Sequence, residues 1–242
     1  MKNRILRLLF PPKCEGCLEP LDWYTCESDT VLCKSCLARF ESERAMICDQ
    51  CNKRMDECGC MPTLLAKTGC KAFYKLVPYY PNRSDLVQNR LLYTIKKQRA
   101  PRIHRYLGRK LAPAVQRCRE EVGEGELLLT YLPRSRRAER RNGTDQARML
   151  ADSISNETGI PVKPLLFRAR FGGAVQKKLS RKERISNAQT LFVLREGIEL
   201  KGVTVILVDD LVTTGASMAA AVRLLKRAGA KGFYCIAVAS DA

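Results

Sequence analysis

Short apolar runs alternate with longer amphipathic segments over the C-terminal half of the chain, from Glu126 onward. Short continuous apolar runs predict strands, whereas apolar residues that recur every three or four positions predict helices. The sequence predicts strands at 127–132, 164–167, 190–194, 203–208 and 233–239, and helices at 146–157 and 217–228. Because strands that alternate with helices usually form a mostly parallel sheet with helices on both faces, we expect an α/β fold.

The preceding part of the chain divides into two regions. In the second of these, an apolar run predicts a strand at 72–80, and amphipathic segments predict helices at 87–95 and 102–121. The first region is rich in cysteine and contains few long apolar runs. We therefore predict a small cysteine-rich domain over residues 1–70 and an α/β domain over residues 71–242.

The chain has twelve cysteines, and most of them lie in the first 70 residues. Several form Cys-x-x-Cys pairs, which in a chain without a secretory signal indicate metal ligands rather than disulfides. A site made only of cysteine leaves no open position for a catalytic water, so we expect structural zinc. We predict two zinc ions, one bound by Cys14, Cys17, Cys33 and Cys36 and the other by Cys48, Cys51, Cys58 and Cys60.

The second cysteine set departs from the usual spacing, because its closing pair is Cys58-Gly59-Cys60. Cys70 could replace one of its ligands, or the site could be distorted or unoccupied. We expect the remaining cysteines to be unliganded: Cys26, Cys118 and Cys235.

Two absences suggest where the protein works. No signal peptide precedes the cysteine pairs, and no apolar stretch reaches the roughly 18 residues that a membrane-spanning helix needs. We therefore expect a cytoplasmic protein without membrane insertion.

The segment Val205–Ser217 carries the most specific chemistry in the chain. A buried strand ends in Asp209 and Asp210, a short loop follows, and a helix begins near Ser217. Such a turn directs backbone N–H groups and the positive end of a helix at one point, which suits a phosphate. The two acids can accept hydrogen bonds from sugar hydroxyls or bind Mg²⁺.

The same segment closely resembles the motif with which type I phosphoribosyltransferases bind phosphoribosyl pyrophosphate (PRPP). That motif has four apolar residues, two acids, two variable residues and then Thr-Thr-Gly-x-Ser. The resemblance implies that Asp209 and Asp210 contact the ribose hydroxyls and that Mg²⁺ accompanies PRPP. It also implies a 5-phosphate site formed by Thr213, Thr214, Gly215, Ala216 and Ser217.

Two further stretches resemble the ComF family. The segment Pro133–Ala147 is similar to a proline- and arginine-containing segment of that family that ends in Gly-Phe-Asn-Gln, although this chain has Gly143-Thr144-Asp145-Gln146 there. A second family signature is matched by Gln176, Leu179, Arg184, Asn187 and Phe192. With the cysteine pairs and the PRPP motif, the resemblance covers nearly the whole chain.

The ComF resemblance implies a double zinc ribbon followed by a phosphoribosyltransferase-like domain. In naturally competent bacteria, members of this family take part in the uptake of transforming single-stranded DNA beside a helicase-like ATPase. In type I enzymes the loop after the first strand of the domain binds pyrophosphate, and arginine can bind phosphate through two N–H groups. Arg134, Arg136 and Arg137 are therefore candidate pyrophosphate ligands, with a solvated basic turn as the alternative.

The chain is strongly basic, with a formal net charge of +18, which favours a polyanionic partner or simply increases solubility. Between Lys96 and Arg141 there are 14 basic residues and five glutamates. The nearby tyrosines, Tyr79, Tyr80, Tyr93 and Tyr106, would suit single-stranded DNA, whose bases stack on aromatic rings. The alternative is a solvated helix face with tyrosines in the core. A second basic segment, 168–184, suits either a loop that closes over an anion or a nucleic-acid contact.

Two functions are left open by the sequence. In the first, a competence-associated protein binds PRPP or a related phosphoribosyl ligand and contacts single-stranded DNA. In the second, the protein is an active phosphoribosyltransferase, in which an unidentified base or amine displaces pyrophosphate. We favour the first, leave catalysis open and assign no catalytic residue. The single histidine, His104, is expected to be a surface or hydrogen-bonded residue rather than a base.

Overall fold

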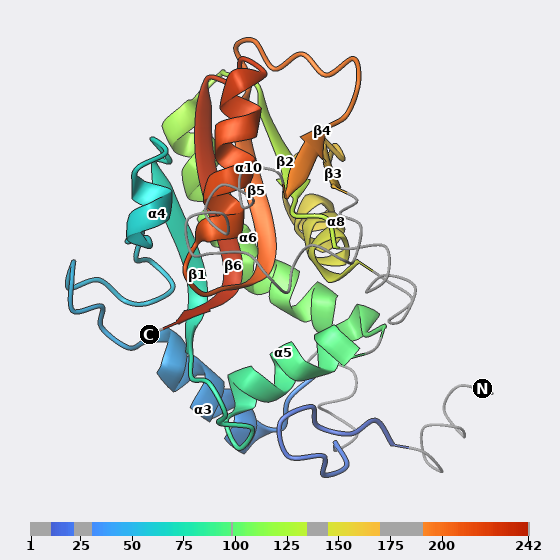
Figure 1. Cartoon of the computed structure of the whole chain (residues 1–242). Coiled ribbons are helices and arrows are strands. Elements are labelled where there is room, and N and C mark those ends of the chain that lie inside the picture. The colour runs from blue at the N-terminus through green and yellow to red at the C-terminus, as the bar shows by residue number, and fades with distance from the viewer. Residues whose placement is uncertain (1–10, 22–30, 98, 135–144, 170–190, 242) are drawn as a thin grey trace, which may run out of the picture.

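The computed structural model of the chain describes residues 11–21, 31–97, 99–134, 145–169 and 191–241. Its centre is a four-stranded sheet with the strand order β1-β6-β5-β2, in which all neighbours run parallel (Figure 1). The strands are β1 (Ala72–Tyr79), β2 (Leu127–Tyr131), β5 (Thr204–Val212) and β6 (Gly232–Asp241). All four were predicted from the apolar runs, and the α/β fold class is confirmed.

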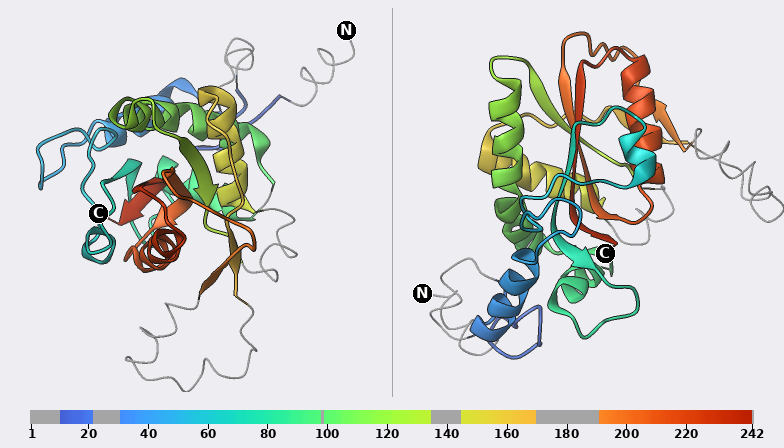
Figure 2. Two further views of the ribbon diagram at one scale, coloured as in Figure 1. Left: turned by 90° about the horizontal axis from the view of Figure 1, so that it is seen from above. Right: turned by 90° about the vertical axis from the view of Figure 1, so that its left-hand side faces the viewer.

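Helices cover both faces of this sheet (Figure 2). One face carries α6 (Pro101–Val122) and α8 (Gln146–Thr158), with α5 (Val87–Lys97) packed against α6 and β1; the other carries α10 (Ala216–Arg227) and the short α4 (Thr63–Ala66). The predicted bounds of α6, α8 and α10 agree with these to within one residue at each end. None of the helices described is both long and apolar enough to cross a membrane.

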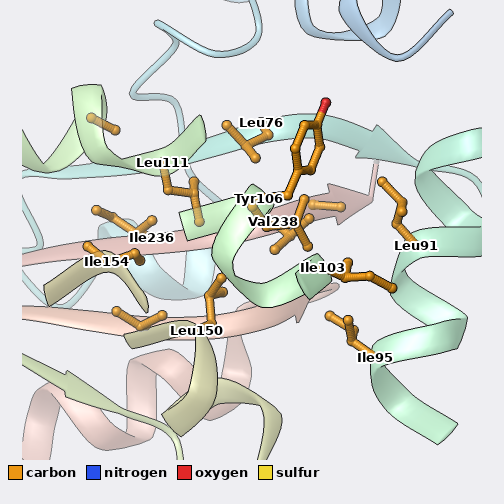
Figure 3. Packing of buried hydrophobic residues seen from close by; sticks show 14 of the residues in the cluster. Leu76, Leu91, Ile95, Ile103, Tyr106, Leu111, Leu150, Ile154, Ile236 and Val238 are labelled. Carbon is orange, nitrogen blue, oxygen red and sulfur yellow. The ribbon is translucent and has the colours of Figure 1, made fainter. Parts of the chain in front are cut away.

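The two central strands are buried on both sides. β6 is buried from Gly232 to Ser240, and β5 from Thr204 to Val208. Above one face, aliphatic side chains of the sheet meet those of the covering helices; Figure 3 shows Leu111, Leu150, Ile154 and Ile236 among them. Because both faces are covered, these strands appear in the sequence as nearly continuous apolar runs instead of alternating ones.

Two shorter apolar runs do not join the parallel sheet. They form β3 (Leu166–Arg168) and β4 (Phe192–Leu194), which pair antiparallel in a separate two-stranded sheet. Just before β3, Val162 makes a parallel bridge to Leu129 of β2. The next donor of that ladder, Leu165 N, bonds to Thr130 Oγ1 at 3.4 Å instead of to a carbonyl of β2, so the chain leaves the main sheet at this point.

The cysteine-rich segment packs directly on the α/β layers. Its helix α3 (Lys34–Arg44) places Phe40, which is fully buried, 6.0 Å from the ring of Tyr106 on α6, measured between ring centroids. Polar contacts also join the two parts: Arg90 Nη1 to the Gly16 carbonyl (2.5 Å), Lys110 Nζ to Glu41 Oε1 (2.7 Å) and Arg117 Nη2 to the Asp56 carbonyl (2.8 Å). The division into 1–70 and 71–242 stays a prediction, since both parts contribute to one hydrophobic core.

Candidate functional site

The predicted acidic pair lies at the carboxyl edge of the parallel sheet. β5 continues to Val212, beyond the predicted end at Val208, so Asp209 and Asp210 are within the strand. Because side chains alternate along a strand, the two carboxylates leave on opposite faces. Asp209 lines a small cavity formed by the loop before α10, whereas Asp210 contacts Arg134 on the other face. The two carboxylates therefore face two neighbouring sites on opposite sides of the sheet, although the two residues are adjacent in the sequence.

The loop between β5 and α10 encloses a cavity of about 60 Å³, lined by Asp209 and residues 211–218. Gly215 is the N-cap of α10 and has φ +72°, in the left-handed region that favours glycine. A Cβ there would also lie 3.0 Å from Cβ of Pro62. The Thr213 and Thr214 side chains are exposed at the opening. Since the first N–H groups of a helix have no partner within it, the loop offers donors to an anion.

Arg134, three residues after the end of β2, contacts the neighbouring strand β5. Its Nη2 donates to Asp210 Oδ2 at 3.1 Å, and its backbone N donates to Asp145 Oδ2, also at 3.1 Å. Asp145 caps α8 by accepting from Arg148 N at 3.3 Å. The two bonds use different carboxylate oxygens, whereas an asparagine has one acceptor oxygen and could keep only one of them in this geometry.

Not every candidate ligand of this region can be placed. Arg136 and Arg137 lie outside the described residues, as do Gln176 to Asn187 of the second ComF signature and most of the basic segment 168–184. Phe192 of that signature is buried in β4.

The acidic pair carries an electrostatic cost. Burial raises the pKa of Asp209 well above its usual range, and the neighbouring charge of Asp210 raises it further. A hydrogen bond from Asp210 N to Asp209 Oδ1, at 2.9 Å, acts in the opposite direction. The ionised form of Asp209 is therefore unfavourable until a cation or a hydroxyl donor reaches it.

The single histidine is buried and hydrogen-bonded, which is the second of the two expected alternatives. His104 lies on α6 with its Nδ1 2.7 Å from the Ala100 carbonyl oxygen, so that Nδ1–H donates, while Nε2 has no partner among the described residues. Burial lowers the pKa of His104, although the hydrogen bond to Ala100 and the charge of Asp210 oppose this. The neutral ring is thus part of the core under the acidic pair.

The first cysteine set forms a compact tetrad. The sulfur atoms of Cys14, Cys17, Cys33 and Cys36 all lie within 4.8 Å of one another, and Cys17 Sγ is 3.7 Å from Cys33 Sγ. Four thiolates around zinc, each about 2.3 Å from the metal, would be roughly 3.8 Å apart, far beyond a disulfide bond. A Cβ on Gly16 would come within 2.7 Å of Cys36 Sγ, so this turn requires glycine. The donor set fits a structural zinc ion.

The second tetrad brings together Cys48, Cys51, Cys58 and Cys60, again within 4.8 Å. Its closing Cys-Gly-Cys pair lies beside β1, where Phe73 N donates to the Gly59 carbonyl at 3.1 Å. Lys75, buried in β1, donates to Cys58 Sγ at 3.4 Å and to the Cys60 carbonyl at 3.3 Å. A tetrathiolate site carries excess negative charge, so this ammonium group supports metal binding here.

Cys70, the alternative ligand for the second site, lies elsewhere. Its sulfur is 3.7 Å from Cys235 Sγ and donates to the Ala72 carbonyl at 3.3 Å, in the core on the α10 side of the sheet. Cys118 and Cys235 are buried outside both tetrads, as expected, and Cys26 lies outside the described residues.

Comparison with known proteins agrees with the strand–loop–helix geometry. Over residues 129–242 the sequence matches the family model of the phosphoribosyl transferase domain. This part of the chain is a phosphoribosyltransferase-type domain. Its sheet is completed by β1, which lies before the matched residues and pairs with β6.

Individual relatives match the phosphoribosyltransferase-type domain only in part. The adenine phosphoribosyltransferase of Mycobacterium tuberculosis (strain H37Rv) is 41% identical over 63 residues, or 25% of this chain and 30% of that protein. The chain thus spans less than a third of the length of the curated relatives it matches.

Solved structures with a similar fold include adenine phosphoribosyltransferase from Saccharomyces cerevisiae, 22% identical, with a TM-score of 0.34 over 55% of this chain and 68% of that one. Hypoxanthine phosphoribosyltransferase from Staphylococcus aureus is 8% identical, with a TM-score of 0.36 over 57% and 62% of the two chains.

Two residues at the site escaped the sequence-based prediction. Pro62 packs against Gly215 of the phosphate loop, although 153 positions separate them, and nothing in the local sequence indicates this contact. Lys75 did leave a signal: a lone lysine inside the apolar run of β1 must find a partner if it is buried. The four cysteine thiols nearby were the available partner.

Replacing Asp209 by asparagine should stabilise the protein while removing the acid. Because the folded-state pKa of Asp209 is raised, its ionisation opposes folding, and this cost grows as pH rises from the unfolded-state pKa of about 4 through the folded-state value. Thermal unfolding should therefore show Asp209→Asn gaining stability over wild type at neutral pH and losing that advantage toward pH 4. The control Asp152→Asn removes an exposed acid of α8 and should show no such pH-dependent gain; an Asp209→Asn protein that is less stable at neutral pH would contradict the assigned cost.

Elemental analysis of the purified chain should find about two zinc ions. Cys36→Ser and Cys58→Ser should each lower the count by about one, whereas Cys118→Ser, at a buried cysteine outside both tetrads, should leave it unchanged. Lys75→Met should weaken retention at the second tetrad by about 10- to 100-fold in competition with a chelator. A count near one that Cys58→Ser does not change would remove the second site.

Proposed function

We propose that this protein binds PRPP, or a closely related phosphoribosyl ligand, at the carboxyl edge of its sheet. The observation that supports this most strongly is the shared cavity of Asp209 and the loop at 211–218, which opens at the N-terminus of α10. The loop would hold the 5-phosphate through its backbone N–H groups and through Thr213 and Thr214. The ribose hydroxyls would donate to Asp209 and Asp210.

The proposed ligand also complements the charged groups of the site. Carboxylates and phosphate oxygens are the ligands that Mg²⁺ prefers, and Mg²⁺ bound with PRPP would offset the cost of ionising Asp209. Arg134 lies beside Asp210, where its guanidinium group could bind the pyrophosphate of the same ligand. Displacement of pyrophosphate needs positioning and charge stabilisation more than side-chain chemistry, so this site would also suit a phosphoribosyl transfer to a base or amine.

The whole chain fits a ComF-type protein. Two cysteine tetrads precede a phosphoribosyltransferase-type domain, the combination that the sequence resemblance implies. On that resemblance we propose a role in natural competence, in the cytoplasm, beside a helicase-like ATPase. An active transferase on an unidentified base or amine is the alternative.

The paired substitution Asp209→Ala with Asp210→Ala should abolish PRPP binding while the domain stays folded. Equilibrium dialysis with labelled PRPP and Mg²⁺ measures this, and circular dichroism with zinc analysis checks the fold. A matched control, Asp152→Ala with Glu157→Ala, removes the same charge from exposed positions of α8 and should bind like wild type. Unchanged PRPP affinity in the Asp209 and Asp210 variant would remove the site.

A second proposed activity, contact with single-stranded DNA, is supported by the basic surface at the start of α6. Lys97, Arg99, Arg102 and Arg105 are exposed there, near the same edge of the sheet as the phosphate loop. The predicted aromatic contribution is smaller, because Tyr106 is buried and the Tyr79 and Tyr93 hydroxyls lie 3.4 Å apart. Phosphate neutralisation would therefore dominate such binding.

If this surface binds the DNA backbone, affinity for an oligothymidine should fall steeply between about 50 and 200 mM salt. Lys97→Gln with Arg99→Gln should reduce the slope of log affinity against log salt by about 0.7 for each phosphate that is no longer neutralised. Lys201→Gln with Lys231→Gln, at the amino edge of the sheet, serves as the control. Fluorescence anisotropy measures both, and a flat salt dependence in wild type would exclude binding to the backbone.

A further inference from the structure

A second hollow lies beside the phosphate loop and is larger than the loop's own cavity. It has a volume of about 480 Å³ and is formed by the second cysteine tetrad, the carboxyl ends of β1 and β6, and Thr213. Figure 1 shows the segment after α3 beside the C-terminal end of β6. This volume is within the range of about 300–1,000 Å³ that is usual for small-molecule sites. We call this hollow the ribbon groove.

One wall of the ribbon groove is apolar and rich in sulfur. Met46, Ile47, Met55, Met61, Pro62 and Tyr80 contribute to it. Met46 and Ile47 are 41% and 56% exposed, which makes them two of the few large apolar side chains at the surface of the described residues. Methionine sulfur makes favourable contacts with aromatic rings and adapts to their shape. The wall therefore suits the face of a flat ring.

Polar side chains also line the ribbon groove. They are Ser240 and Asp241, at the end of β6, and Asp49 and Gln50 of the tetrad segment. These side chains offer hydrogen-bond acceptors and donors to the edge of a ring that carries N–H groups and ring nitrogens. A flat group with apolar faces and a polar edge is the chemistry of a nucleobase.

The ribbon groove is continuous with the phosphate loop. Thr213 lines both hollows, and Pro62, in the groove wall, packs against Gly215 of the loop. A ring in the groove would therefore lie next to a ribose held by Asp209. This is the relation that an acceptor must have to a phosphoribosyl donor.

The second tetrad holds the apolar wall in place. Lys75 ties Cys58 and Cys60 to β1, and the Phe73–Gly59 hydrogen bond runs alongside. Cys48, Cys60 and Lys75 themselves line the groove. The metal site would thus shape a ligand site in addition to stabilising the fold. This role would explain why the second tetrad lies against the sheet.

We propose that the ribbon groove binds a nucleobase or a similar heteroaromatic acceptor, with the second cysteine tetrad as one wall. This deepens the proposed function and rests on it. In the transfer, a ring nitrogen would form a bond to C1 as the bond from C1 to the pyrophosphate oxygen breaks. Pyrophosphate would leave with that electron pair, and the proton on the ring nitrogen would pass to water.

The test uses 2-aminopurine, whose fluorescence changes on binding, with the zinc-loaded full chain. Met46→Asp and, separately, Ile47→Asp place a charge on the exposed apolar wall, and Val193→Asp does the same on β4, outside the groove. We expect 2-aminopurine affinity to fall at least about tenfold in both groove variants and to be unchanged in Val193→Asp. PRPP affinity should stay within about twofold of wild type in all three.

The outcomes separate the two proposals. If wild type binds PRPP but binds 2-aminopurine weakly or equally well in the groove variants, the ribbon groove is not the acceptor site and the PRPP site stands. If wild type fails to bind PRPP while 2-aminopurine binding depends on Met46 and Ile47, the groove stands as a base site and the proposed function falls. Loss of oligothymidine binding in the groove variants, without any binding of the free base, would assign the groove to DNA and overturn the acceptor proposal.

Discussion

The structure depends on a buried parallel strand, β5, that carries two neighbouring carboxylates in its last part. β5 is covered on both faces up to Val208, and the acids follow at once, where burial makes the charge of Asp209 costly. The surrounding elements offset part of the electrostatic cost of ionising Asp209. Arg134 pairs with Asp210, and the N-terminus of α10 opens next to Asp209. Ionisable groups whose charged form is disfavoured by burial are more often functional than structural, because binding a cation or a sugar recovers the energy.

The cysteine-rich segment is built onto this edge. Phe40 enters the core beside α6, Lys75 reaches out of β1 to the second tetrad, and Pro62 supports the turn at Gly215. The phosphate loop therefore rests on residues that follow the last cysteine of the second tetrad. Loss of metal at that tetrad would disturb the loop through this packing, which links two features that are far apart in the sequence. Under the proposed function, the cysteine-rich segment would form part of the ligand site.

The sequence was sufficient for most of the fold and for the two cysteine tetrads. Continuous apolar runs located the four strands, because both faces of the sheet are covered, and cysteine spacing located both tetrads. The antiparallel pairing of β3 with β4 could not be predicted, since it depends on where the chain leaves the ladder beside β2, after Lys163. The burial of His104 and the contact of Pro62 with Gly215 could not be predicted either, because both arise from tertiary packing that leaves no local periodicity. The opposite directions of Asp209 and Asp210 follow from strand alternation, but only once the strand is known to extend through them.

Calorimetric titration of the folded, zinc-loaded protein with PRPP, in the presence and absence of Mg²⁺, tests the central claim most directly. We predict saturable binding that depends on Mg²⁺, because the metal offsets the charge of the pyrophosphate and of the acidic pair. Absence of binding in protein shown to be folded and to contain zinc would contradict this claim, and would leave the loop before α10 as a scaffold without its ligand.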